Sequence, residues 1–121
     1  MADNKDYIVH PDNQGSINIS TEVVAAIAAA ATLECDGVAS MYAIGKDISA
    51  FFGKKNASRS VKVQLEEDNM TIDVYLAVKL GVEVNKVGAA VQDSVASAVE
   101  AMTGFAVKTV NVHVTGIVLD K

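Results

Sequence analysis

The sequence predicts a two-layer α+β domain with a mostly antiparallel or mixed sheet of about four to five strands and two helices on one face. Apolar and polar residues alternate from Val61 to Leu80 across an acidic turn, which is typical of two half-buried strands. Two other segments repeat their apolar residues at helical spacing. Such strands need cover on one face only, and two one-sided helices can provide it. The predicted order is β-α-β, a loop, β-β and then α-β.

Composition limits the classes of function. The 121 residues fit one domain, and the net charge of −5 disfavours general nucleic-acid binding, which needs a surplus of Lys and Arg. Aromatic residues make up only 5% and there is no Trp, so Val, Ala, Ile and Leu must build the core. Cys35 is the only cysteine, which excludes an internal disulfide.

Residues 1–14 have little periodicity and are predicted to form a flexible leader, followed by a single α+β domain over 15–121. The amino-terminal residues do not resemble a secretion signal, and no apolar run approaches the roughly 20 residues needed to cross a bilayer. We therefore expect a cytoplasmic protein that could reach the membrane only through a partner or a surface contact.

The first elements are a short strand over Gly15–Ile19 and a helix that ends near Glu34. Ser20 or Thr21 is the expected N-cap, and Gly37 is the expected end of the helix. The predicted buried stripe consists of Val23, Val24, Ile27, Ala28, Ala31 and Cys35. A less regular strand is predicted over Val38–Ala43.

A mobile basic loop is predicted over residues 44–59. It combines the doublet Phe51-Phe52 with four of the ten basic residues, namely Lys46, Lys54, Lys55 and Arg59. Basic residues beside exposed phenylalanines could contact anionic lipid, nucleic acid or an acidic partner. Alternatively, the phenylalanines extend the core and the lysines are a solvated rim.

The hairpin Val61–Leu80 is expected to direct every second residue of its second strand, from Met70 to Leu80, inward. Asn85 is the expected N-cap of the second helix, Lys86–Met102. The predicted apolar stripe of that helix consists of Val87, Val91, Val95, Ala98, Val99 and Met102. In the last strand, Val107–Val118, the residues expected to point inward are Val110, Val112 and Val114.

The chain has few residues suited to catalysis. It has two histidines and no Cys-x-x-Cys, His-Glu-x-x-His or Gly-x-Ser-x-Gly motif, so we predict no enzyme, cofactor or metal site. If the last strand lies beside Met70–Leu80, then Asp73, Tyr75 and His113 become neighbours on the outward sheet face. An acid beside an imidazole can orient it for proton transfer. A solvated face and a flat docking surface remain the alternatives.

The first helix carries alanine on most of its circumference and few charges. Small residues allow another helix to approach closely, so a second subunit could cover this surface. Intrinsic helix propensity explains the same composition without a partner.

Several runs resemble the bacterial alkaline-shock, or Gls-type, envelope stress response family. They include Gly15-Ser-Ile-Asn-Ile, Cys35-Asp-Gly-Val-Ala, Gly81-Val-Glu-Val-Asn, Met102-Thr-Gly and Val110-Asn-Val-His-Val. The resemblance spans Gly15 to about Leu119.

This resemblance implies a non-enzymatic cytoplasmic protein of Gram-positive-type bacteria, linked to alkaline and cell-envelope stress. Some members assemble with themselves, and some are held near the membrane by a separate anchor protein. Phe52–Lys55 looks closer to a branch associated with lipid-synthesis homeostasis. The family has no agreed catalytic residues to carry over.

The combined prediction is a self-associating scaffold or protein-binding module of the envelope stress response. Its expected partners are copies of itself and a membrane-anchored or lipid-synthesis protein. A ligand-sensing or enzymatic role of the outward sheet face, and anionic lipid or nucleic-acid contact through residues 44–59, are the alternatives.

Overall fold

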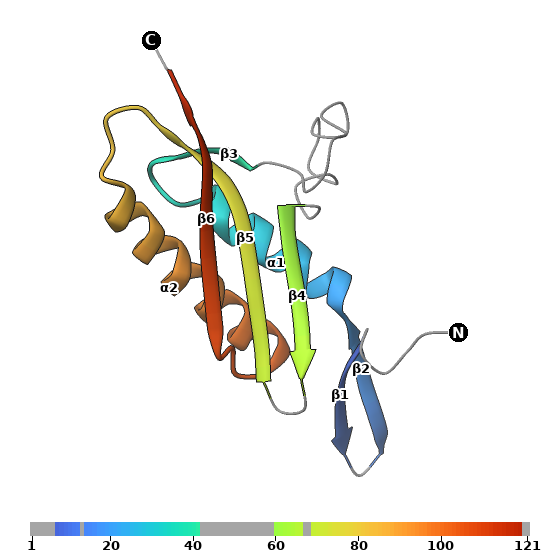
Figure 1. Ribbon diagram of the computed structural model, residues 1–121. Coiled ribbons are helices and arrows are strands. Elements are labelled where there is room, and N and C mark those ends of the chain that lie inside the picture. Colours follow the sequence, from blue (N-terminus) through green and yellow to red (C-terminus); the bar gives the residue numbers. More distant parts are fainter. Residues whose placement is uncertain (1–6, 13, 42–59, 67–68, 120–121) are drawn as a thin grey trace.

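The computed structural model describes residues 7–12, 14–41, 60–66 and 69–119 (Figure 1). Two helices and a sheet form the predicted α+β fold. The strands are β1 (Tyr7–Asp12), β2 (Gly15–Ser20), β3 (Val38–Met41), β4 (Val61–Glu66), β5 (Asn69–Lys79) and β6 (Thr109–Val118). The helices are α1 (Thr21–Leu33) and α2 (Val84–Thr103).

Strand β5 is the centre of the main sheet, because β3, β4 and β6 all pair with it. β4 and β3 are antiparallel to β5 and lie end to end along one side of it, β4 beside Asn69–Val74 and β3 beside Leu76–Val78. β6 occupies the other side and runs parallel to β5. The sheet is therefore mixed, because it contains both parallel and antiparallel pairs. A parallel pair of strands requires a crossover connection, and α2 supplies the one between β5 and β6.

Both helices cover the same face of the sheet (Figure 1). The residues of β5 that point toward them are buried from Met70 to Val78 at every second position, as the alternation predicted. The buried residues of α2 are Val87, Val91, Val95, Val99 and Thr103. No aromatic side chain belongs to the fully buried core of the described chain, which valine dominates.

Between the two helices, Cys35 approaches Ser94, with 3.4 Å from Sγ to Oγ. The thiol also lies 3.5 Å from the carbonyl oxygen of Ala31, one turn back along the chain. It is partly buried against the core, in agreement with a small packing residue near the end of a helix.

The amino-terminal segment differs from the prediction. Tyr7–Asp12, expected within a flexible leader, form β1, which pairs antiparallel with β2 from Tyr7 and Ser20 to Asp12 and Gly15. The resulting hairpin is a separate two-stranded sheet that extends away from the main sheet (Figure 1). The strand was missed because its residues carry little apolar alternation and include Pro11, which is compatible with an edge strand.

The ends of the helices confirm one predicted cap and correct another. Ser20 caps α1, and its Oγ accepts a hydrogen bond of 3.2 Å from the backbone N–H of Val23. Asn85 is not the cap of α2. The helix starts at Val84, and Glu83 is the N-cap residue without a side-chain hydrogen bond. The backbone carbonyl of Glu83 instead accepts from the N–H groups of Lys86 and Val87.

After α2 the chain enters β6 through a hydrogen-bonded turn. Gly104 ends the helix, and its N–H donates to the carbonyl of Glu100 at 2.9 Å. The Glu100 carboxylate then accepts from the N–H of Val107, and Lys108 N–H donates to the carbonyl of Met70. These bonds position the chain beside β5, and β6 begins at Thr109 rather than at Val107.

Several residues predicted to point inward are exposed. Val23 on α1, Met102 on α2, Leu80 after β5 and Val114 on β6 are 48%, 70%, 62% and 37% exposed. In α1 the buried stripe is rotated toward Ala25, Ala29 and Thr32. The helical period was right, but a nearly uniform run of alanines does not specify which side faces the core.

Candidate functional site

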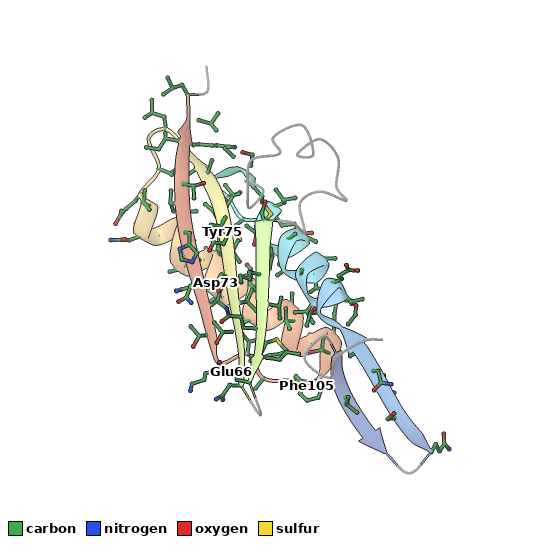
Figure 2. All side chains as sticks on the ribbon, turned by 45° about the vertical axis from the view of Figure 1, so that its right-hand side comes forward. Glu66, Asp73, Tyr75 and Phe105 are labelled. Carbon is green, nitrogen blue, oxygen red and sulfur yellow. The ribbon has the colours of Figure 1, made fainter. Side chains whose placement is uncertain are left out.

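The outward face of the sheet brings together the three polar residues that the sequence singled out. β5 and β6 are parallel and in register, so that Asp73 lies beside Asn111 and Tyr75 beside His113. Residues two apart on a strand share a face, which places all four side chains on the side opposite the helices. Figure 2 shows Asp73 and Tyr75 following one another along β5.

Asp73 is the hydrogen-bonding centre of this group. Its Oδ1 accepts from Asn111 Nδ2 at 3.0 Å and lies 3.1 Å from His113 Nε2. An ionised carboxylate only accepts hydrogen bonds, so the contact with His113 requires a proton on Nε2. On β4, Lys62 is the register partner of Asp73 and adds a positive charge to the same face.

The imidazole of His113 is also held by an aromatic neighbour. The rings of Tyr75 and His113 stack, with centroids 4.5 Å apart and planes inclined by 14°. Stacking and the bond to Asp73 together fix the orientation of the imidazole. We refer to Asp73, Tyr75, Asn111 and His113 as the outer-face cluster.

The surroundings of Asp73 favour its charged form. Burial alone would raise the pKa of Asp73, but the hydrogen bonds from His113 and Asn111 and the nearby positive charges lower it overall, below the usual 3.8. The carboxylate is only 15% exposed, whereas the His113 side chain is 42% exposed and accessible from solvent. Asp73 is thus an anion that orients a solvent-accessible imidazole.

A pH-dependent contribution to stability follows for Asp73. Because its pKa is lower in the folded protein, the contribution is complete at pH values above about 4 and declines as the pH falls through the folded pKa. Replacing Asp73 with Asn should lower the free energy of unfolding by about 1 kcal/mol near pH 7. The difference from wild type should shrink below pH 3.8. Urea unfolding at several pH values measures both effects.

Glu66→Gln is the matched control, because Glu66 is exposed at the end of β4 and its side chain hydrogen-bonds no described residue. This change should leave stability within about 0.5 kcal/mol of wild type at each pH. An Asp73→Asn effect that is equal at neutral and acid pH would contradict the assigned charge-dependent role.

Chemically, the outer-face cluster has an acid–imidazole pair but few of the other parts of an active site. No group of three His, Cys, Asp or Glu residues that could hold a metal ion occurs among the described residues. No serine, threonine or cysteine hydroxyl or thiol hydrogen-bonds His113 in the part of the chain described. The arrangement can bind a polar group or take up a proton at the imidazole.

Asn111 was not among the predicted site residues, although it hydrogen-bonds directly to Asp73. Its signal was present in the sequence, since it precedes His113 by two residues on a clearly alternating strand. The other candidate surface, formed by Lys46, Phe51, Phe52, Lys54, Lys55 and Arg59, lies outside the described residues, and its role stays a prediction.

Taken together, these features define a small two-layer α+β protein with one helix-covered sheet face and one polar, solvent-facing sheet face. The chain belongs to the alkaline shock protein 23 family, described as having a cell envelope-related function, which matches residues 9–119. This membership confirms the family suggested by the sequence runs. No helix in the described ranges is long and apolar enough to span a membrane.

Similar proteins occur in two Gram-positive bacteria. The chain is 40% identical over 115 residues to uncharacterized protein YqhY of Bacillus subtilis, covering 92% of this chain and 84% of the relative. It is 37% identical over 108 residues to uncharacterized protein Spy1535 of Streptococcus pyogenes, covering 88% and 82%. Uncharacterized protein YloU of B. subtilis is 35% identical over 106 residues, covering 85% and 88%. No solved structure matches the chain.

Proposed function

We propose that this protein is a non-catalytic binding module of the cell envelope system that associates with copies of itself. Family membership supports the envelope-related role. The observation that carries self-association is the exposure of large apolar side chains. More than half of the residue surface is exposed in Ile17, Leu80, Met102, Ile117 and Leu119. Isolated exposed apolar residues are ordinary, but three of these lie together.

The grouped residues are Leu80, Ile117 and Leu119. The N–H of Leu80 donates to the carbonyl of Val118 at 3.0 Å, so the end of β5 lies directly beside the end of β6. Ile117 is the register partner of Val78 and therefore lies on the helix-side face, where Val78 is buried but Ile117 is 56% exposed. We call Leu80, Ile117 and Leu119 the apolar end patch.

Self-association predicts a concentration-dependent mass. Size-exclusion chromatography with light scattering, over a range of micromolar concentrations, should give a mass above that of one chain, falling toward it on dilution. The association should persist at high salt, because apolar contacts are not screened as ionic contacts are. A single chain mass at every concentration would refute this part of the proposal.

A second candidate is a ligand-sensing or enzymatic role of the outer-face cluster, favoured by the meeting of Asp73, Tyr75 and His113. The Asp73→Asn protein distinguishes the two. If the protein binds a ligand through this cluster, cells carrying that variant should lose the function of the protein, although the variant protein remains folded. A normal response to envelope stress would leave the cluster as a stabilising feature of the sheet.

The proposed module requires partners beyond itself. A membrane-anchored or lipid-synthesis protein remains the expected partner, together with a cytoplasmic location and membrane association through that partner. Contact with an anionic surface through residues 44–59 is a further prediction that the described part of the chain does not address.

A further inference from the structure

Among the described strands, β6 has a pairing partner on one edge only. It pairs with β5 on one side, and no other described strand pairs with it. The strand is ten residues long, Thr109–Val118, and contains no proline, lysine, arginine, aspartate or glutamate. Exposed edge strands usually carry such residues, because unpaired backbone groups otherwise recruit another strand. A β-bulge also protects an edge, and β6 has one at Thr115, so the part of the edge that is open to another strand is Thr109–Val114.

Apolar side chains remain exposed along this edge. On the helix-side face of β6, Val110 and Val112 are partly buried, whereas Val114 and Ile117 are 37% and 56% exposed. The apolar end patch continues this surface at Leu80 and Leu119, which are 62% and 75% exposed. The α2 helix therefore covers the start of β6 better than its end.

We propose that β6 pairs antiparallel with β6 of a second copy, about a two-fold axis near Val112, so that the two sheets become continuous. This inference rests on the proposed self-association and names the surface that performs it. About such an axis Val110 faces Val114 and Asn111 faces His113, and the regular pairing ends there because the register of β6 against β5 shifts at Thr115. Apolar residues thus face apolar ones and polar residues face polar ones.

This self-complementarity favours a second copy over an unrelated strand. An isologous interface requires that one surface fit itself, and β6 satisfies this on both faces over Val110–Val114 without placing like formal charges opposite one another. The free edge already accepts a hydrogen bond from a side chain, since Gln92 Nε2 donates to the carbonyl of Val110 at 3.0 Å. A pairing strand would share or replace this single contact.

The same arrangement provides cover for the apolar end patch. Antiparallel pairing brings the end of β6 in one copy to the segment that precedes β6 in the other. That segment contains Phe105 and Val107, which are partly buried against the core. Ile117 and Leu119 lie beyond the bulge and would approach this segment, and burying them would add stability to the paired strands.

The exposed side of α1 is the competing surface. Val23, Ala26, Ala30 and Leu33 are exposed at helical spacing there, and they could also pack against a second copy. This side lacks unpaired backbone groups that would fix a register, whereas β6 has them. Substitutions on α1 therefore serve as the comparison.

The first experiment compares two double variants by sedimentation and light scattering. Val114→Lys with Ile117→Lys places charges within the proposed interface and should raise the dissociation constant about 100-fold. Val23→Lys with Leu33→Lys makes the same chemical change on α1 and should leave the constant within about threefold of wild type. Circular dichroism of each variant verifies the fold.

A second experiment tests the register without relying on a disruptive change. In a Cys35→Ser background, proteins carrying Asn111→Cys or His113→Cys should cross-link to each other when mixed and oxidised. Each protein alone should cross-link far less, because residue 111 of one copy faces residue 113 of the other. Mass spectrometry identifies the linked peptides.

The outcomes separate this inference from the broader proposal. A wild-type protein that remains a single chain refutes both. A self-associating wild type that the β6 variant leaves unchanged, or that the α1 variant alone dissociates, overturns the β6 pairing and leaves self-association standing. Cross-linking of each cysteine variant equally well by itself would also overturn the proposed register.

Discussion

Replacing Leu76 with alanine is expected to lower the free energy of unfolding by about 3 kcal/mol. Leu76 is fully buried on the central strand, where it pairs with Met41 of β3 on one side and with Val114 of β6 on the other. Strands on both sides and helices beneath limit how far the surroundings can collapse into the space left by the side chain. The loss therefore includes a cavity term in addition to the lost apolar burial.

Urea unfolding monitored by circular dichroism measures this loss, and Leu80→Ala is the matched control. Leu80 follows the same strand but is 62% exposed, so its truncation should change the free energy of unfolding by about 0.5 kcal/mol or less. Comparable effects at the two positions would contradict the assignment of Leu76 to the centre of the core.

Gly37→Ala should cost about 2 to 3 kcal/mol. Gly37 has φ +95°, a conformation that side chains disfavour, and a Cβ there would lie 2.6 Å from Cγ2 of Val87. The carbonyl of Gly37 also accepts the N–H of Lys79 at 2.9 Å, so the backbone cannot move without loss of that bond. The substitution thus combines backbone strain with a collision between the end of α1 and the start of α2.

Gly81→Ala separates the two causes. Gly81 has nearly the same φ, +98°, but no atom lies within 4 Å of the position of its Cβ. Its substitution should cost only the backbone term, about 1 kcal/mol. Thermal unfolding of both variants gives the difference, and equal losses would refute the steric contribution of Val87.

The sequence was sufficient to predict the sheet and its outer face. Strict alternation in β5 and β6 defines which residues share a side, so the meeting of Asp73, Tyr75 and His113 required only that the two strands be neighbours. A helical crossover between consecutive parallel strands makes that neighbour relation common. The sequence therefore predicted the cluster only on the condition that these two strands are neighbours, and the structure supplies that strand order.

Other features could not be predicted, for identifiable physical reasons. The orientation of α1 depends on tertiary contacts, because alanine gives similar burial on most sides of a helix. Val114 and Leu80 are exposed because α2 does not cover this end of the sheet. The alternation of residues in a strand does not indicate how far a helix covers it. β1 lacked a signal because the residues Tyr7–Asp12 show no regular apolar alternation in the sequence.

The end-to-end placement of β3 and β4 has a consequence for how the family can diversify. Both strands are held by β5, so the chain joining Met41 to Ser60 connects two points that the sheet already fixes. Each strand pairs with its own part of β5, so neither pairing sets the length of that connection. We therefore expect relatives to differ in length and charge across this interval while β5 preserves the scaffold.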